Sequence, residues 1–165
     1  MKKILFTLFF ALLFTTYSCT STKRSTEVGS AVTAVAVQQQ DTGTVFLDIT
    51  FQEALEKAGQ EDKLVFIDCY TQTCIPCKMM IKKVFPHKTC GTYINSNFVP
   101  IMMDMENGEG IDIAERYNVQ MYPTYLIISP DGNKIGEIIG AEKNVDLFVS
   151  KIKDATNGVK SFGNN

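Results

Sequence analysis

The chain is 165 residues long, which leaves room for one ordinary domain together with a short targeting segment or tail. Apolar residues make up 45% of it and charged residues 21%, as in a globular protein with a single core. The net charge is −2, with Lys and Arg mixed among Asp and Glu. Because this pattern contains no basic stripe, we expect no nucleic-acid partner.

The N-terminus has the pattern of an export signal. Lys2 and Lys3 precede an apolar run at residues 4–14, and Cys19 follows shortly afterwards. This order is typical of a secretory signal peptide, whereas a membrane span needs roughly 20 apolar residues. We therefore expect residues 1–18 to be a signal peptide, and the protein to be exported to a bacterial periplasm or cell envelope.

The motif Thr16-Tyr17-Ser18-Cys19 resembles the lipobox of bacterial lipoproteins, whose Cys is acylated and becomes the mature N-terminus. The resemblance implies a lipid anchor on Cys19 and thus contact with a membrane. Thr20 stands where Asp would favour the inner membrane, which implies the outer membrane. Thr16 and Tyr17 depart from the Leu and the small residue that the lipobox prefers. Cleavage that leaves Cys19 as a plain thiol is therefore the alternative.

Regular patterning begins at Val45 and predicts one domain over residues 41–158, between a flexible tether at 19–40 and a frayed tail at 159–165. The expected elements are, in order, a strand at 45–49, a helix at 51–59, a strand at 64–67, helices at 75–85 and 92–97, a strand at 98–103, a helix at 111–117, strands at 125–128 and 134–139, and a helix at 145–152. Such alternation followed by a terminal hairpin and helix predicts an α/β fold, with a central mixed sheet flanked by helices on both faces.

The motif Cys74-Ile75-Pro76-Cys77 directly follows a buried strand and opens a helix. The thiolate is the form of cysteine that attacks disulfides, and a helix N-terminus favours that anion. Two intervening residues let the cysteines close a disulfide within one turn. We expect Cys74 to be the exposed nucleophile and Cys77 to be the shielded thiol that resolves the mixed disulfide.

Residues 65–78 resemble the active-site strand and helix of thioredoxins, and Met121-Tyr122-Pro123-Thr124 resembles the cis-proline loop of that family. The resemblance covers roughly residues 45–154 and is greatest for small secreted thioredoxin-like proteins of bacterial envelopes. It implies a thioredoxin-like fold and thiol–disulfide oxidoreductase activity on disulfides of other envelope proteins.

The resemblance also implies roles for individual residues. Asp68 matches a buried carboxylate that helps to take the proton of the resolving Cys, and burial raises the pKa of such a group. Pro123 matches the cis-proline, beside which the backbone of Tyr122 pairs with a substrate segment. Ile75 and Pro76, between the cysteines, would also contact the substrate. The alternative for Asp68 is a carboxylate that only makes a structural hydrogen bond at the strand end.

Two departures from the family pattern bear on the direction of electron flow. Thr73 replaces the usual Trp before the first Cys, and Ile75 replaces the usual Gly after it. The dipeptide between the cysteines lacks the His of strong DsbA-type oxidants, which favours a reductase over an oxidase or isomerase. We expect no cofactor and a monomer. A membrane-linked electron donor is expected because the periplasm is kept oxidising.

Three alternatives stay open. Cys74, Cys77, His87 and Cys90 have a spacing that also occurs in zinc sites, although a helix at 75–85 would carry His87 about 15 Å from Cys74. Cys69 is expected to be an inert core thiol on the face of its strand opposite Asp68, yet it or Cys90 could form a second, regulatory disulfide. Finally, the domain could be a non-catalytic binding module with a structural disulfide.

Overall fold

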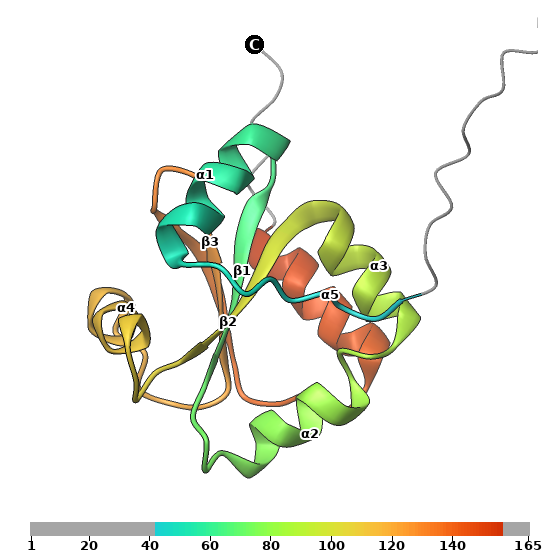
Figure 1. Cartoon of the computed structure of the whole chain (residues 1–165). Coiled ribbons are helices and arrows are strands. Elements are labelled where there is room, and N and C mark those ends of the chain that lie inside the picture. Colours follow the sequence, from blue (N-terminus) through green and yellow to red (C-terminus); the bar gives the residue numbers. More distant parts are fainter. Residues whose placement is uncertain (1–41, 157–165) are drawn as a thin grey trace, which may run out of the picture. The chain divides into compact units, whose positions relative to one another are not determined.

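The computed structural model describes residues 42–156 of the chain (Figure 1). The elements in this part are α1 (Phe51–Glu61), β1 (Leu64–Tyr70), α2 (Ile75–Lys83), α3 (Lys88–Asn97), β2 (Phe98–Asp104), α4 (Glu109–Tyr117), β3 (Thr124–Ile128), β4 (Lys134–Ile139) and α5 (Val145–Thr156). The strands form one sheet in the order β2-β1-β3-β4. Strand β1 pairs in parallel with β2 and antiparallel with β3, and β3 pairs antiparallel with β4. The predicted α/β fold with a mixed sheet is confirmed.

Local chemistry explains where several of these elements begin and end. Thr50 and Glu53 form the predicted capping box at the start of α1, and the Glu53 carboxylate accepts a hydrogen bond from the Thr50 amide at 2.8 Å. The turn between β3 and β4 contains Gly132 at a φ of +82°, a conformation that glycine adopts without strain. The hairpin predicted from this turn is therefore present.

The two faces of the sheet carry separate hydrophobic clusters. Helices α1 and α4 cover one face, where Cys69 of β1 is buried among mainly aliphatic side chains. Helices α2, α3 and α5 cover the other face (Figure 1), which holds the aromatic cluster. The members of this aromatic cluster are Phe66, Phe85, Phe98, Tyr125 and Phe148. Asp68 lies on the same face of β1 as Phe66, since alternate residues of a strand share a face.

The strand predicted at residues 45–49 is wrong. This segment makes a single bridge, between Leu47 and Ile101 of β2, and is otherwise irregular. Pro100, also in β2, has no amide hydrogen to donate and only accepts, from the Leu47 amide at 2.8 Å. The amide of Val45 instead donates to the side chain of Asn95. The edge of the sheet is thus covered by a strap that is not itself a strand.

Several helices are longer than predicted, among them α3 and α5, the latter running to Thr156 instead of residue 152. Some predictions fall outside the described residues. The helix expected at 92–97 begins at Lys88, because His87 caps it by accepting a hydrogen bond from the Thr89 amide. No helix in residues 42–156 is long and apolar enough to cross a membrane. The signal peptide, the Cys19 anchor, the tether at 19–40 and the tail at 159–165 lie beyond the residues that the structure describes.

Candidate active site

The cysteine motif lies where the sequence predicts it, at the start of α2. Cys74 is the N-cap of this helix and forms a disulfide with Cys77, with Cα atoms 5.3 Å apart. Cys74 is half-buried, whereas Cys77 is only 1% exposed. Cys77 is therefore more shielded than Cys74, as predicted, while their roles as resolving thiol and nucleophile remain predictions.

The start of α2 favours a thiolate on Cys74. The Cys77 amide donates a hydrogen bond to Cys74 Sγ at 3.1 Å, so the sulfur occupies the position of a capping oxygen. Pro76, in the first turn, has no amide hydrogen, at a position where such a hydrogen would find no acceptor within the helix. Lys82 and Lys83 in the last turn complement the opposite end of the helix dipole. A negative charge on Cys74 would thus be stabilised once the disulfide is reduced.

The loop before β3 reaches the same end of the sheet as Cys74. The Tyr122–Pro123 peptide bond is cis, as predicted. Pro123 is buried, and its carbonyl accepts a hydrogen bond from the Gly140 amide at 2.8 Å. Thr124 pairs with Cys69 near the end of β1, so the loop lies beside the segment that leads from β1 to α2 (Figure 1).

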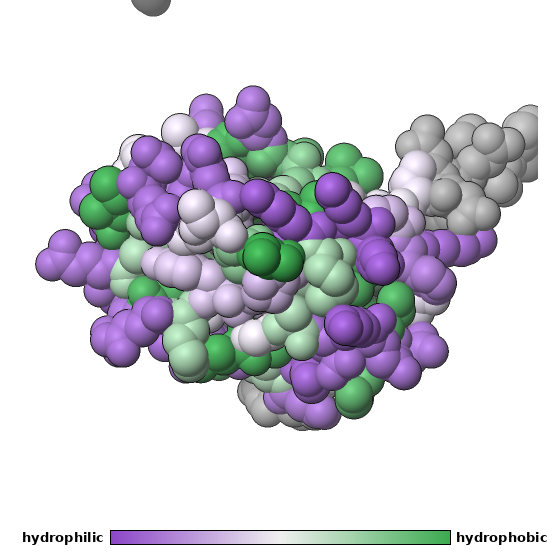
Figure 2. All heavy atoms as spheres, turned by 90° about the horizontal axis from the view of Figure 1, so that it is seen from below, coloured by the Kyte–Doolittle hydropathy of each residue, from purple (hydrophilic) through white to green (hydrophobic). Residues whose placement is uncertain are grey.

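Apolar surface surrounds this end of the molecule. Ile75 is 78% exposed and Met121 is 57% exposed, while Tyr122 is half-buried. Figure 2 views the molecule from this end and shows hydrophobic and near-neutral residues in the middle of the face, next to strongly hydrophilic ones. Such a surface fits the predicted substrate contacts of Ile75, Pro76 and Tyr122, whereas Pro123 is buried behind it. The contacts of all four residues remain predictions.

Asp68 lies on β1 with its carboxyl group wholly buried. Its exposed fraction is 0%, and neither carboxylate oxygen has a hydrogen-bond partner among residues 42–156. Within residues 42–156 no side chain or backbone group supports the alternative in which Asp68 makes a structural hydrogen bond. Burial raises the pKa of Asp68 to about 7, because the apolar surroundings disfavour the anion. A carboxyl group with this pKa can accept and release a proton near neutral pH.

The neighbours of Asp68 include two residues that the sequence does not single out. In the sheet, Asp68 pairs with Met102 of β2 and with Tyr125 of β3. The Tyr125 hydroxyl is buried and, like the carboxylate, has no hydrogen-bond partner in the described part of the chain. The sequence predicts which residues of one strand share a face, but it does not predict which residues of neighbouring strands lie opposite one another.

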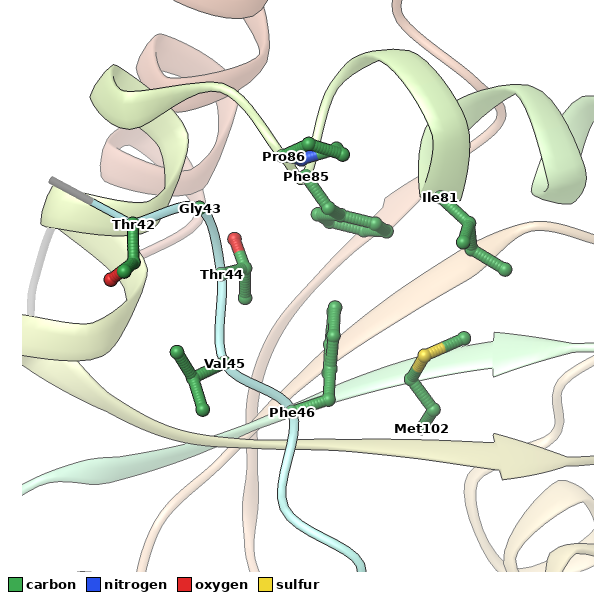
Figure 3. Close-up of a pocket in the computed structure, with 9 residues that line it drawn as sticks. All are labelled: Thr42, Gly43, Thr44, Val45, Phe46, Ile81, Phe85, Pro86 and Met102. Carbon is green, nitrogen blue, oxygen red and sulfur yellow. The ribbon is translucent and has the colours of Figure 1, made fainter.

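A pocket of about 380 Å³ lies between the strap at residues 42–46, helix α2 and strand β2. Figure 3 shows the side chains of Phe46, Ile81, Phe85 and Met102 directed into this space. Met102 is half-buried in its wall and is also the sheet neighbour of Asp68. Met102 thus belongs both to the lining of the pocket and to the sheet position beside Asp68.

The two other cysteines in the described part of the chain, Cys69 and Cys90, do not join the motif. Cys69 and Cys90 are free and buried, and they lie on opposite faces of the sheet. Cys90 Sγ accepts a hydrogen bond from the Thr44 hydroxyl at 3.7 Å, while His87 is exposed at the cap of α3. Residues 42–156 contain no group of three His, Cys, Asp or Glu side chains that could hold a metal ion. The zinc interpretation therefore has no support from the geometry.

Comparison with known proteins agrees with this geometry. The family model of the thioredoxin-like domain matches residues 51–156, and the chain belongs to this family. It is 41% identical over 93 residues to thioredoxin of Mus musculus and 39% identical to that of Pongo abelii; each match covers 56% of this chain and 80% of the relative. It is also similar to the solution structure of a candidate disulphide-isomerase from Bacteroides thetaiotaomicron, with a TM-score of 0.64 and 39% identity over 72% of this chain and 98% of that one.

Family, fold and site define one class of enzyme. A Cys-x-x-Cys pair at a helix N-terminus, on a thioredoxin-like domain, exchanges its disulfide with those of other molecules. The protein is a thiol–disulfide oxidoreductase, and Cys74 and Cys77 form its redox-active disulfide.

Proposed function

We propose that this protein reduces or rearranges disulfides in other proteins of a bacterial cell envelope, with reduction as its main activity. The observation that carries the proposal is the combination of an accessible Cys74 at a helix N-terminus, a shielded Cys77 one turn later, and a buried carboxyl group on the preceding strand. A disulfide with only a structural role would need neither the N-terminal placement nor the carboxyl group.

The reaction follows from these positions. In the reduced enzyme, the Cys74 thiolate attacks one sulfur of a client disulfide, which forms a mixed disulfide and releases the other client sulfur as a thiolate. Cys77 then gives its proton to the Asp68 carboxylate and attacks Cys74 Sγ. This step forms the Cys74–Cys77 disulfide and releases the second client thiol. Two electrons have passed from the enzyme to the client.

A membrane dithiol donor is needed to complete the cycle in an oxidising compartment. Such a donor would pass two electrons to the Cys74–Cys77 disulfide and restore both thiols. We propose export through residues 1–18 and attachment to the outer membrane through a lipid on Cys19. Metabolic labelling with a radioactive fatty acid tests the anchor: the natural chain should be labelled and Cys19→Ser should not.

Trapping of clients tests the proposed mechanism. In Cys77→Ser the mixed disulfide cannot be resolved, so clients should stay attached to Cys74 and appear as adducts on non-reducing gels that disappear with a reductant. Cys74→Ser is the matched control, because it keeps one motif cysteine but lacks the nucleophile, and it should trap nothing. Turnover of a model disulfide substrate should be lost in both variants. If Cys77→Ser forms no adducts in envelope extracts, the mechanism is wrong.

The direction of electron flow is tested by the reduction potential of the Cys74–Cys77 pair, equilibrated with glutathione. A potential of about −270 mV, as in thioredoxin, would support a reductase. A potential of about −120 mV, as in DsbA, would instead identify a donor of disulfides. A pair that does not exchange at all would identify a binding module with a structural disulfide.

A further inference from the structure

Tyr125 is a buried polar residue that the reaction above does not use. Its ring lies in the aromatic cluster, stacked on Phe66 with centroids 5.7 Å apart and an interplanar angle of 14°. Phe85 and Phe148 contact the same ring edge-on. Phenylalanine would fill this position equally well. The hydroxyl is costly to bury without a partner, so its presence requires an explanation.

The sheet places this hydroxyl on the same side as the carboxyl group of Asp68. Tyr125 and Asp68 are direct cross-strand partners on β3 and β1, and directly opposed residues of antiparallel strands project from the same face. Both residues are 0% exposed. Within residues 42–156, their oxygens are the buried side-chain N and O atoms that have no hydrogen-bond partner.

Within residues 42–156, the other ionisable groups that interact with Asp68 or Tyr125 are uncharged when protonated. Tyr70 of β1 shares the face of Asp68 and is half-buried. Cys90 of α3 faces Tyr125 and interacts with the Thr44 hydroxyl, and Cys69 lies on the opposite face of β1. The α2 group on this side is Cys77, and β2 contributes the uncharged Met102. None of these is a cation, so a carboxylate at Asp68 would depend on neutral dipoles.

We propose that Tyr125 is a positioning residue, whose hydroxyl dipole stabilises the ionised form of Asp68 and so sets the pH at which Asp68 takes the proton of Cys77. The inference rests on the proposed function, because it concerns the resolving step of that reaction. Tyr125 itself keeps its proton throughout, since burial and the neighbouring Asp68 raise the pKa of its hydroxyl far above the usual value.

Tyr125→Phe tests the inference, since it removes the hydroxyl and keeps the ring. The rate of mixed-disulfide resolution is measured by rapid quench between pH 5 and pH 9. The Asp68 titration is followed separately by infrared difference spectroscopy of the carboxyl band. Loss of the dipole should move both midpoints upward by about one pH unit, which makes resolution roughly tenfold slower below the midpoint. Fluorotyrosine introduced at position 125, a stronger donor, should move both midpoints downward.

Tyr117→Phe is the matched control. Tyr117 is 7% exposed, donates its hydroxyl to the Gly132 carbonyl at 2.8 Å, and belongs to the cluster on the other face of the sheet. This variant loses a buried hydroxyl, yet its pH profile should coincide with that of the natural protein. Coincident profiles for Tyr125→Phe and the natural protein would overturn the inference. If the natural protein shows no exchange, the proposed function fails, while the infrared titration still decides whether Tyr125 acts on Asp68.

Discussion

Two neighbouring residues of β1, on opposite faces of the sheet, differ in the chemistry that burial leaves them. Asp68 and Cys69 are adjacent in β1, are both 0% exposed, and project to opposite faces. Burial raises the pKa of Asp68 to about 7 and raises the pKa of Cys69 far above its ordinary value. Desolvation raises the pKa of both groups, but the ordinary pKa of a carboxyl group is much lower than that of a thiol.

This difference separates the chemical role of one face from the structural role of the other. The shift moves the Asp68 carboxyl group into the range where it exchanges protons at neutral pH. The same effect keeps Cys69 a protonated thiol, which is unreactive toward disulfides. A buried group becomes useful in proton transfer only when its altered pKa falls near the working pH. The α2–α3–α5 face meets this condition at Asp68, and the α1–α4 face does not meet it at Cys69.

The largest expected effect on stability comes from Asp68→Asn, which replaces the titrating carboxyl group on the α2–α3–α5 face by an amide that does not titrate. Between about pH 4 and pH 7 the folded protein keeps the Asp68 proton, whereas the unfolded chain releases it. The free energy of unfolding of the natural protein should therefore fall as the pH rises through this range, by about 2–4 kcal/mol. Urea denaturation at pH 4.5 and pH 8 should show this fall in the natural protein, and it should be largely absent in Asp68→Asn.

The two proteins are compared by how much the free energy of unfolding changes with pH, not by its absolute value. Asn at position 68 leaves a buried amide without a partner, and the cost of that amide is the same at both pH values. Asp48→Asn is the control for loss of one carboxylate, since Asp48 is exposed. It should keep the slope of the natural protein. Equal slopes in the natural protein and Asp68→Asn would mean that Asp68 does not hold a proton in the folded state at neutral pH, and the contrast with Cys69 would lose its basis.

The sequence predicts the parts of the site that depend on neighbours along the chain. The start of α2 at the cysteine motif, the different shielding of Cys74 and Cys77, and the cis bond before Pro123 all follow from local signals or from the family resemblance. The opposite orientations of Asp68 and Cys69 follow from the two-residue period of a strand. These features needed no knowledge of tertiary contacts.

The parts that could not be predicted depend on pairing between distant segments. The partnership of Asp68 with Met102 and Tyr125 requires the strand register, which is fixed by packing on both faces. The failed strand at 45–49 shows the same limit, because its apolar pattern is strand-like but Pro100 of β2 cannot donate to it. Residues 42–46 instead form a wall of the pocket beside Met102.

Met102→Lys tests whether the absence of a cation keeps the pKa of Asp68 near 7. Met102 lines the pocket, so a lysine there can extend its ammonium group toward solvent while its stem stays packed. The positive charge should lower the pKa of Asp68 by about one unit, because it favours the carboxylate. Infrared titration of the carboxyl band measures the shift. Met102→Leu, of similar size and without charge, should leave the midpoint in place, and an unchanged midpoint in Met102→Lys would contradict the expected interaction.

Cys69→Ala should have the smallest effect and probes the other side of the comparison. The change removes one buried sulfur from a packed cluster, so the free energy of unfolding should fall by about 1 kcal/mol. Turnover of a disulfide substrate and its pH profile should match those of the natural protein, because Cys69 faces away from Asp68 and stays protonated. Cys90→Ala, on the aromatic face, provides the parallel measurement. A loss of turnover in Cys69→Ala without a comparable loss of stability would show that a second thiol takes part in the reaction, and the α1–α4 face would then have a chemical role as well.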